Sequence, residues 1–358
     1  MTKARQLADL GNAYDDGALS NRNLIINGAM QVAQRGTSFV MGSSEGYTLD
    51  RWKSQGTYDT ESLTIEQSSD APSGFGNSLK VSVTTAEGTA DANDYHYITQ
   101  KFEGQNLTQL GYSSSNAKTL TVSFWVKSSI AQTYCISLYQ TNGNLHYSAT
   151  YSVNSANTWE YKTVYILSST NSIANNSTQG LEMGFMLGAG TSYSSGSNNS
   201  WGGATNFAAG ASHTFMTTVN ATFQLTGVQL ELGDTATPFE HRSYGDELAK
   251  CQRYYSRLSS DGSVYAEFGL IAAYDSTQGI AYIQYPTTMR TSPTATQVGN
   301  FIASADSNLP VTVFTFQNAT KNGIRDHITV ASGFGAKQVF RLRNNNDNDA
   351  YIEFDAEL

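Results

Sequence analysis

Three glutamates fall on predicted strands and carry the side chain that glycoside hydrolysis requires. That reaction uses two carboxylates about 5–10 Å apart, one of which acts as an acid. Glu160, Glu182 and Glu231 could supply such a pair, but their spacing in the sequence does not show that any two converge. We therefore expect a protein that is not an enzyme, and we keep a polysaccharide depolymerase as an alternative.

Metal ligation has few candidates in this sequence. The five histidines are scattered singly, and none forms a His-x-x-x-His pair. The two cysteines, Cys135 and Cys251, lie far apart and are expected to be free thiols. Asp50 or Glu231 could serve a structural Ca²⁺, although a carboxylate that caps a loop or forms a salt bridge is the simpler interpretation. We expect no metal and no cofactor.

Aromatic residues among short polar ones point to a different chemistry, the binding of carbohydrate. Aromatic faces can stack on sugar rings, while Ser, Thr and Asn side chains hydrogen-bond to hydroxyl groups. Trp125 stands on the otherwise polar face of its strand, and Tyr139 falls on the neighbouring strand. Further rings are expected on loops or strand ends, at Tyr147, Tyr151, Tyr193 and Trp201. The candidate sugar contacts are Trp125, Tyr139, Tyr147 and Trp201, with packing under a loop or in a subunit interface as the alternative for each.

The charge of the chain excludes some partners. It carries 21 Lys and Arg against 30 Asp and Glu, a net charge of −9, whereas a non-specific nucleic-acid binder needs a basic surface. No stretch approaches the ~18 apolar residues of a membrane-spanning helix, and the first ten residues lack the apolar region of a signal peptide. We expect no nucleic-acid partner and no membrane insertion.

The polar residues of the chain are mostly uncharged. There are 41 Ser, 39 Thr and 27 Asn, and charged residues make up 14%, against about 25% in a typical domain. Aromatic residues are 11%, which is too many for a disordered chain. A surface with few charged side chains can bind a sugar or a neighbouring subunit at a low desolvation cost.

The elements that would position these residues are short strands. From Leu120 to Lys127, apolar side chains alternate with polar ones, which fixes the register of a strand with one buried face. Similar strands are expected at residues 24–30, 47–53, 62–66, 78–83, 134–140, 160–167, 181–187 and 215–231. Trp52 and Trp159 follow turn-type residues and are expected in the core. Many short strands with Gly, Asn and Ser between them indicate a β-sandwich or a barrel.

One helix interrupts the strand pattern. Over residues 244–258, Leu248, Cys251, Tyr255 and Leu258 share a helical face. A second series of strands follows in residues 259–358, enough for a small sandwich. The predicted fold is therefore all-β, with two β-sandwich, jelly-roll-like modules at 21–243 and 259–358 joined by the helix at 244–258.

The first 20 residues form a short segment of their own. Ala4, Leu7 and Leu10 recur at helical spacing before a Gly11-Asn12 stop signal. Three apolar positions cannot hold a core, so we expect a short helix that docks on its own chain or on a partner.

Several stretches resemble virion appendage proteins of tailed bacteriophages. Residues 21–36 (NRNLIINGAMQVAQRG) and 47–52 (YTLDRW) resemble the opening of their first module, and 120–128 (LTVSFWVKS) resembles its central strand. Three later stretches resemble its close: 228–233 (VQLELG), 237–240 (TPFE) and 247–257 (ELAKCQRYYSR). Residues 286–293 (PTTMRTSP) and 350–358 (AYIEFDAEL) are similar to a C-terminal β module of the family.

The resemblance implies a fold and a role. The first module would be a jelly roll like those of carbohydrate-binding modules, and residues 1–20 would attach to the particle through Ala4, Leu7 and Leu10. The protein would be a structural component of the virion, made in the host cytoplasm, and commonly a homotrimer. As a tail fibre or appendage, it would contact other virion proteins and the polysaccharide of the bacterial surface. A capsid, collar or baseplate decoration protein with no receptor is the alternative.

Overall fold

The computed structural model describes residues 3, 5, 22–42, 45–57 and 62–358. The chain divides into two compact units, residues 1–247 together with Leu358 (unit 1) and residues 248–357 (unit 2). The expected attachment residues Ala4, Leu7 and Leu10 lie outside the described residues. Within the described part of the chain, no helix is long and apolar enough to cross a membrane.

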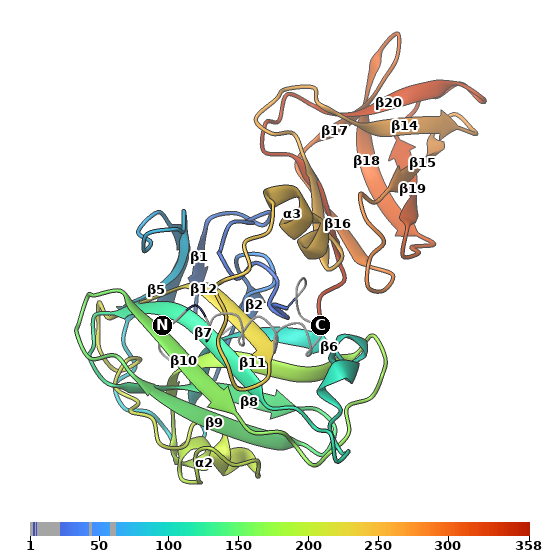
Figure 1. Cartoon of the computed structure of the whole chain (residues 1–358). Helices are drawn as coiled ribbons and strands as arrows, with labels where there is room; N and C mark the ends of the chain where they lie inside the picture. Colours follow the sequence, from blue (N-terminus) through green and yellow to red (C-terminus); the bar gives the residue numbers. More distant parts are fainter. Residues whose placement is uncertain (1–2, 4, 6–21, 43–44, 58–61) are drawn as a thin grey trace. The chain divides into compact units, whose positions relative to one another are not determined.

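Unit 1 is a β-sandwich of two six-stranded antiparallel sheets (Figure 1). Sheet A contains, in spatial order, β1 (Ser38–Met41), β4 (Ser62–Ser68), β5 (Ser78–Thr85), β12 (Thr222–Leu232), β7 (Leu120–Ser128) and β10 (Glu160–Ile166). Sheet B contains β2 (Gly46–Tyr47), β3 (Lys53–Gly56), β6 (Tyr95–Glu103), β11 (Gln179–Ala189), β8 (Thr133–Gln140) and β9 (Leu145–Ser152). In residues 62–243 of this unit the short helices are η1 (Gly104–Leu110), α2 (Thr191–Ser194) and η2 (Ala204–Asn206). The prediction of an all-β fold is confirmed.

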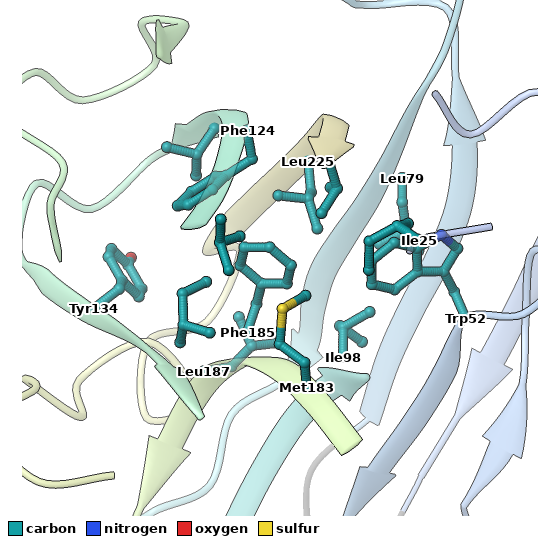
Figure 2. Close-up of a cluster of buried hydrophobic side chains, with 14 of the residues drawn as sticks. Ile25, Trp52, Leu79, Ile98, Phe124, Tyr134, Met183, Phe185, Leu187 and Leu225 are labelled. Carbon is teal, nitrogen blue, oxygen red and sulfur yellow. The ribbon is translucent and has the colours of Figure 1, made fainter. Parts of the chain in front are cut away.

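The core of unit 1 lies between the inner faces of the two sheets. Phe124 of β7 packs edge-to-face on Phe185 of β11, with ring centroids 5.0 Å apart (Figure 2). Trp52 has no exposed surface, as predicted, and its indole N–H donates to the backbone oxygen of Asn27. Trp159 was expected in the core, which is wrong. It is only partly buried, because its indole N–H donates to the exposed carboxylate of Asp70 at 3.1 Å.

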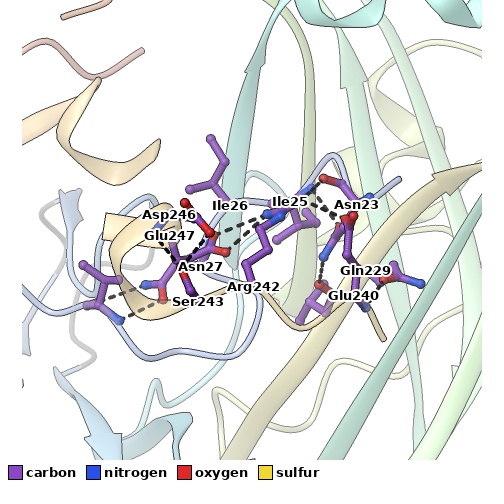
Figure 3. A network of polar contacts seen from close by, with 12 residues as sticks. Asn23, Ile25, Ile26, Asn27, Gln229, Glu240, Arg242, Ser243, Asp246 and Glu247 are labelled. Carbon is purple, nitrogen blue, oxygen red and sulfur yellow. Dashed lines mark hydrogen bonds and ion pairs between the residues drawn. The ribbon is translucent and has the colours of Figure 1, made fainter. Parts of the chain in front are cut away.

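Residues 22–30, whose apolar residues suggested a strand, form an irregular segment instead (Figure 3). Asn27 is completely buried, and its side chain exchanges hydrogen bonds with the backbone of Val32 and donates to the backbone oxygen of Asp50. Asn27 and Met30 have positive φ angles of 59° and 57°, which a strand does not allow. At Gly28, a Cβ atom would lie 2.2 Å from the backbone oxygen of Val228. Close backbone packing therefore replaces strand pairing here.

The helix predicted at 244–258 is shorter than expected. It is α3 (Tyr244–Gln252), and the prediction is wrong beyond Gln252, because β13 (Tyr255–Ser259) follows. This strand pairs with β21 (Tyr351–Asp355). The Arg257 guanidinium forms an ion pair with Glu353 at 3.0 Å, and the Tyr255 hydroxyl donates to the same carboxylate. Pairing with a distant strand thus overrides the local helical pattern.

Unit 2 is also all-β, but it is not the expected sandwich. A closed barrel contains, in order, β14 (Glu267–Ala273), β15 (Gln278–Gln284), β19 (Gly323–Val330), β18 (Asn308–Gln317), β17 (Phe301–Ser304) and β20 (Val339–Asn344). A three-stranded sheet contains β13, β21 and β16 (Thr294–Val298). Irregular pairing in β14 and β18 bends these strands and helps the sheet to close on itself.

Candidate functional site

A groove of about 410 Å³ lies on the face of sheet B that points away from the core. Alternation along each strand brings side chains from several strands to this face. Strand β6 contributes Tyr95, Tyr97 and Lys101, while β11 contributes Glu182 and β8 contributes Tyr139. The other lining residues are Gln55, Asn144, His146, Gln179, Tyr193, Ala204 and Phe207.

Strand register places Glu182 at the centre of this set. Glu182 lies directly opposite Lys101 of β6 on one side and opposite Tyr139 of β8 on the other. Two residues further along β11 is Gly184, where a Cβ atom would lie 2.4 Å from the ring of Tyr97. A glycine is therefore required for the Tyr97 ring to take its place beside β11.

The aromatic wall of the groove comes from the segment after β11. Phe207 packs edge-to-face on Tyr97 at 5.2 Å and on His146 at 5.0 Å, and Tyr193 of α2 packs on Tyr95 at 5.0 Å. Beneath the wall, Cys135 joins the same apolar cluster. These contacts fix the positions of the rings without any ligand.

The same segment is also hydrogen-bonded to sheet B. The backbone of Gly202 exchanges hydrogen bonds of 2.8 and 2.9 Å with that of His146, and the Ser148 hydroxyl donates to the backbone oxygen of Ala209 at 3.0 Å. Within the segment, Ala208 donates to Tyr193 at 2.8 Å. The wall is thus fixed to strand β9.

Both carboxylate oxygens of Glu182 are hydrogen-bonded within the groove. Its Oε1 atom accepts hydrogen bonds from the Tyr97 hydroxyl at 2.6 Å and from the Thr99 hydroxyl at 3.0 Å, and Oε2 accepts from the Gln179 amide at 3.1 Å. Burial raises the pKa of Tyr97 well above its usual value, so its hydroxyl stays protonated and continues to donate. Glu182 therefore organises the floor of the groove.

Two groups in the groove have unused hydrogen-bonding capacity. The Lys101 ammonium makes no hydrogen bond or ion pair with any residue that the structure describes. Burial lowers its pKa, and the Glu182 carboxylate acts in the opposite direction. Burial also lowers the pKa of His146, whose Nδ1 atom has no partner among the described residues. The imidazole is therefore neutral at neutral pH.

Of the four predicted sugar contacts, Tyr139 lines this groove. Tyr147 was expected to be exposed, which is wrong. It points into the core from β9, has no exposed surface and accepts a hydrogen bond from the backbone of Leu167. Trp201 is partly buried, packs on Tyr147 with ring centroids 5.1 Å apart, and donates from its indole N–H to the backbone oxygen of Leu167.

Trp125 lies on the opposite sheet, away from the groove. It stands on the outer face of sheet A beside Tyr161 of β10, with ring centroids 5.5 Å apart. Tyr161 is 47% exposed, and Tyr165 on the same face is 55% exposed. A sugar contact at Trp125 stays a prediction.

Sequence reasoning missed most of the lining residues. Tyr95, Tyr97 and Lys101 lie on a strand that was not predicted, although they alternate on one face of it. Two tyrosines two positions apart, Tyr95 and Tyr97, followed at the same spacing by Thr99 and Lys101, are the signal that could have identified this strand face. Phe207 carried no such signal, since its place depends on how a long loop folds back.

The three glutamates considered for hydrolysis do not share a site. Glu182 belongs to sheet B, whereas Glu160 and Glu231 lie on sheet A, paired with Val126 and Thr121 near opposite ends of β7. Glu160 forms an ion pair with Lys162 at 2.5 Å.

The carboxylates considered for calcium cap loops. Burial raises the pKa of Asp50, whose carboxylate accepts a backbone hydrogen bond from Gln34 at 2.6 Å. Glu231 accepts from the backbone and the hydroxyl of Thr237 at 2.7 and 2.6 Å. Within the described ranges, no group of three or more His, Cys, Asp or Glu side chains could hold a metal ion.

Comparisons with family models and with curated proteins find no match. Among solved structures, the chain is similar to the enzymatically active domain of bacteriophage CBA120 tailspike protein 4, at 14% identity with a TM-score of 0.33. That match covers 59% of this chain and 21% of the tailspike chain. The CBM22-1 xylan-binding domain of Paenibacillus barcinonensis Xyn10C is 14% identical, with a TM-score of 0.28, over 55% of this chain and 95% of that domain. The family 11 carbohydrate-binding module of Clostridium thermocellum Lic26A-Cel5E is 16% identical, with a TM-score of 0.27, over 57% and 98% of the two chains. Similarities at this level do not define a function.

Proposed function

We propose that unit 1 binds a carbohydrate chain in the groove of sheet B. The observation that carries this proposal is a groove that combines exposed aromatic edges and faces with uncharged polar side chains. Tyr95, Tyr139 and Tyr193 are each only partly buried, so part of each ring is open to a ligand. The amides of Gln55 and Asn144 offer both donors and acceptors, as sugar hydroxyl groups require.

The volume and rigidity of the groove support this proposal. About 410 Å³ falls within the ~300–1,000 Å³ of typical ligand sites. The rings of Tyr95 and Tyr193 already pack on each other, so a ligand meets side chains whose freedom has been lost on folding. Preorganisation of this kind lowers the entropic cost of binding.

We further propose that the protein is a non-enzymatic component of a bacteriophage virion. As a tail fibre or appendage, it would use the groove to contact polysaccharide on the bacterial surface. The support is the sequence resemblance in residues 21–258, which includes the buried Asn27-Gly28 turn. Assembly as a homotrimer and attachment through Ala4, Leu7 and Leu10 belong to the same proposal. A decoration protein without a receptor is the alternative.

Substitutions in the groove test carbohydrate binding directly. The full chain is screened on an array of bacterial surface glycans, and affinities for the bound glycans are measured by calorimetry. We expect Tyr139→Ala and Tyr95→Ala to weaken binding about tenfold or more, because each removes a stacking ring. Tyr161→Ala on sheet A is the matched control and should bind like the native chain.

Two outcomes would contradict the proposal. If Tyr161→Ala loses binding and both groove variants bind normally, the binding site lies on the outer face of sheet A, beside Trp125. An array with no bound glycan, together with no inhibition of phage adsorption by excess protein, would favour a decoration protein. Circular dichroism of each variant confirms that it folds.

A further inference from the structure

We propose that the groove selects an acidic polysaccharide and that Lys101 binds the anionic group of one of its sugars. This inference rests on the proposed carbohydrate binding and adds the chemical class of the ligand. It starts from the charges in the groove. Lys101 and Glu182 are the two charged residues among those that line it, and of the two only the Lys101 side chain makes no hydrogen bond to a described residue.

Glu182 forms no ion pair with Lys101 in this structure. The two residues are directly opposite each other on β6 and β11, yet no ion pair joins them. Both carboxylate oxygens of Glu182 already accept hydrogen bonds from Tyr97, Thr99 and Gln179. The three N–H donors of the Lys101 ammonium make no hydrogen bond to a described residue, so a ligand can accept from them.

The other lysine on this face shows the contrast. Lys53 of β3 lies opposite Thr99 of β6, and its ammonium pairs with Glu45 at 2.6 Å and donates to Gln55 at 3.1 Å. Its charge is thus neutralised within the protein. Lys101 makes no such contact with the described residues, and the Glu182 carboxylate acts on it only through its charge.

Burial makes this cation a selective group. Partial burial deprives the ammonium of hydration, which is why the pKa of Lys101 lies below its usual value. An anion placed beside it restores a favourable environment, whereas a neutral hydroxyl group does so only in part. Charge pairs are also stronger in a groove walled by aromatic rings than on an open surface.

Matched polymers and matched variants test the inference. Acidic bacterial polysaccharides that contain hexuronic acid are compared with the same polymers after reduction of their carboxyl groups to alcohols. A sugar-phosphate polymer, with and without enzymatic removal of phosphate, distinguishes a phosphate from a carboxylate as the source of charge. Calorimetry with the full chain gives the affinity of the native protein, Lys101→Met, Lys101→Arg and the control Lys127→Met, which lies on sheet A and pairs with Asp70.

We expect Lys101→Met to weaken binding of an acidic polymer about tenfold or more, the range for a hydrogen bond to a charged group. Its affinity for the neutralised polymer should equal that of the native protein. Lys101→Arg should keep most of the affinity because it keeps the charge, and Lys127→Met should have no effect. Rising salt should weaken binding of the native protein and not of Lys101→Met.

The possible failures are distinguishable. If the native protein binds the acidic and the neutralised polymers with equal affinity, and Lys101→Met does the same, the proposal of an acidic ligand is wrong. The proposal of carbohydrate binding would still hold. If Tyr139→Ala loses binding to both polymers and Lys101→Met has no effect, carbohydrate binds in the groove but the groove does not select an acidic ligand. If no polymer binds the native protein, the proposed function itself fails.

Discussion

Asp326 is a carboxylic acid inside the apolar barrel of unit 2. It alternates with Ile324, Ile328 and Val330 on the buried face of β19 and has no exposed surface. Its Oδ1 atom accepts one hydrogen bond, from the backbone of Thr315 at 3.1 Å, and Oδ2 has no partner among the described residues. Burial raises the pKa of Asp326 to about 7. The folded barrel therefore binds a proton that the unfolded chain releases at much lower pH.

This residue predicts a pH dependence of stability. The pKa of Asp326 in the folded state lies above the unfolded value of about 3.9. The contribution of the protonated side chain to the free energy of unfolding is therefore complete below about pH 4 and is lost as the pH rises to about 7. The loss is on the order of 4 kcal/mol at about 1.4 kcal/mol per pKa unit. Thermal unfolding of the native chain and of Asp326→Asn, measured across this range, tests the prediction. The variant should be the more stable of the two above about pH 7, and parallel pH profiles for both would contradict the prediction.

At the scale of elements, the strands with one polar face could be predicted from the sequence. The strand expected from Leu120 to Lys127 is β7, because one of its faces packs in the core. Strand β6 was missed because polar residues lie on both of its faces. His96 and Gln100 are buried beside Ile98 on the core side, and Lys101 lines the groove on the other side. The aromatic wall depends on loop folding, and a barrel has the same two-residue period as a sandwich. The aromatic wall and the barrel could therefore not be predicted from the sequence.

The segment at 22–30 and the start of α3 are held together by charge. Arg242 donates to the backbone oxygen of Ile25 at 3.0 Å and forms ion pairs with Glu240 at 3.2 Å and Glu247 at 3.3 Å, while the Glu247 carboxylate accepts from the backbone of Asn27 (Figure 3). These side chains are nearly buried. Removing Arg242 would leave two buried carboxylates without their shared cation.

We therefore expect Arg242→Ala to destabilise the protein by about 3 kcal/mol, as for other broken buried ion pairs. Lys80→Ala is the control, because Lys80 and Glu66 form a more exposed pair at 2.8 Å that is worth about 0–1 kcal/mol. Denaturant unfolding of both variants measures the difference. Equal effects would show that the network around Arg242 adds little to stability.

At the scale of the whole molecule, the first 20 residues are predicted to serve the particle and not the fold. Among the residues that the structure describes, the core of unit 1 begins at Ile25. Deleting residues 1–20 should therefore leave the far-ultraviolet circular dichroism and the thermal unfolding unchanged. Particles assembled with the shortened chain should lack it, as measured by immunoblotting of purified phage. A shortened chain that fails to fold would show instead that the segment belongs to unit 1.

The groove wall has a second consequence, for aggregation. Strand β9 is at one edge of sheet B, and an open edge of this kind offers unpaired backbone groups to the sheets of other molecules. The segment that carries Phe207 occupies part of this edge, through the hydrogen bonds between Gly202 and His146 and from Asn199 to Ser148. Substitutions in that segment can change which ligand is bound only if the segment stays attached to β9. Substitutions that detach it would expose the edge of β9, on which chains can stack into insoluble fibres.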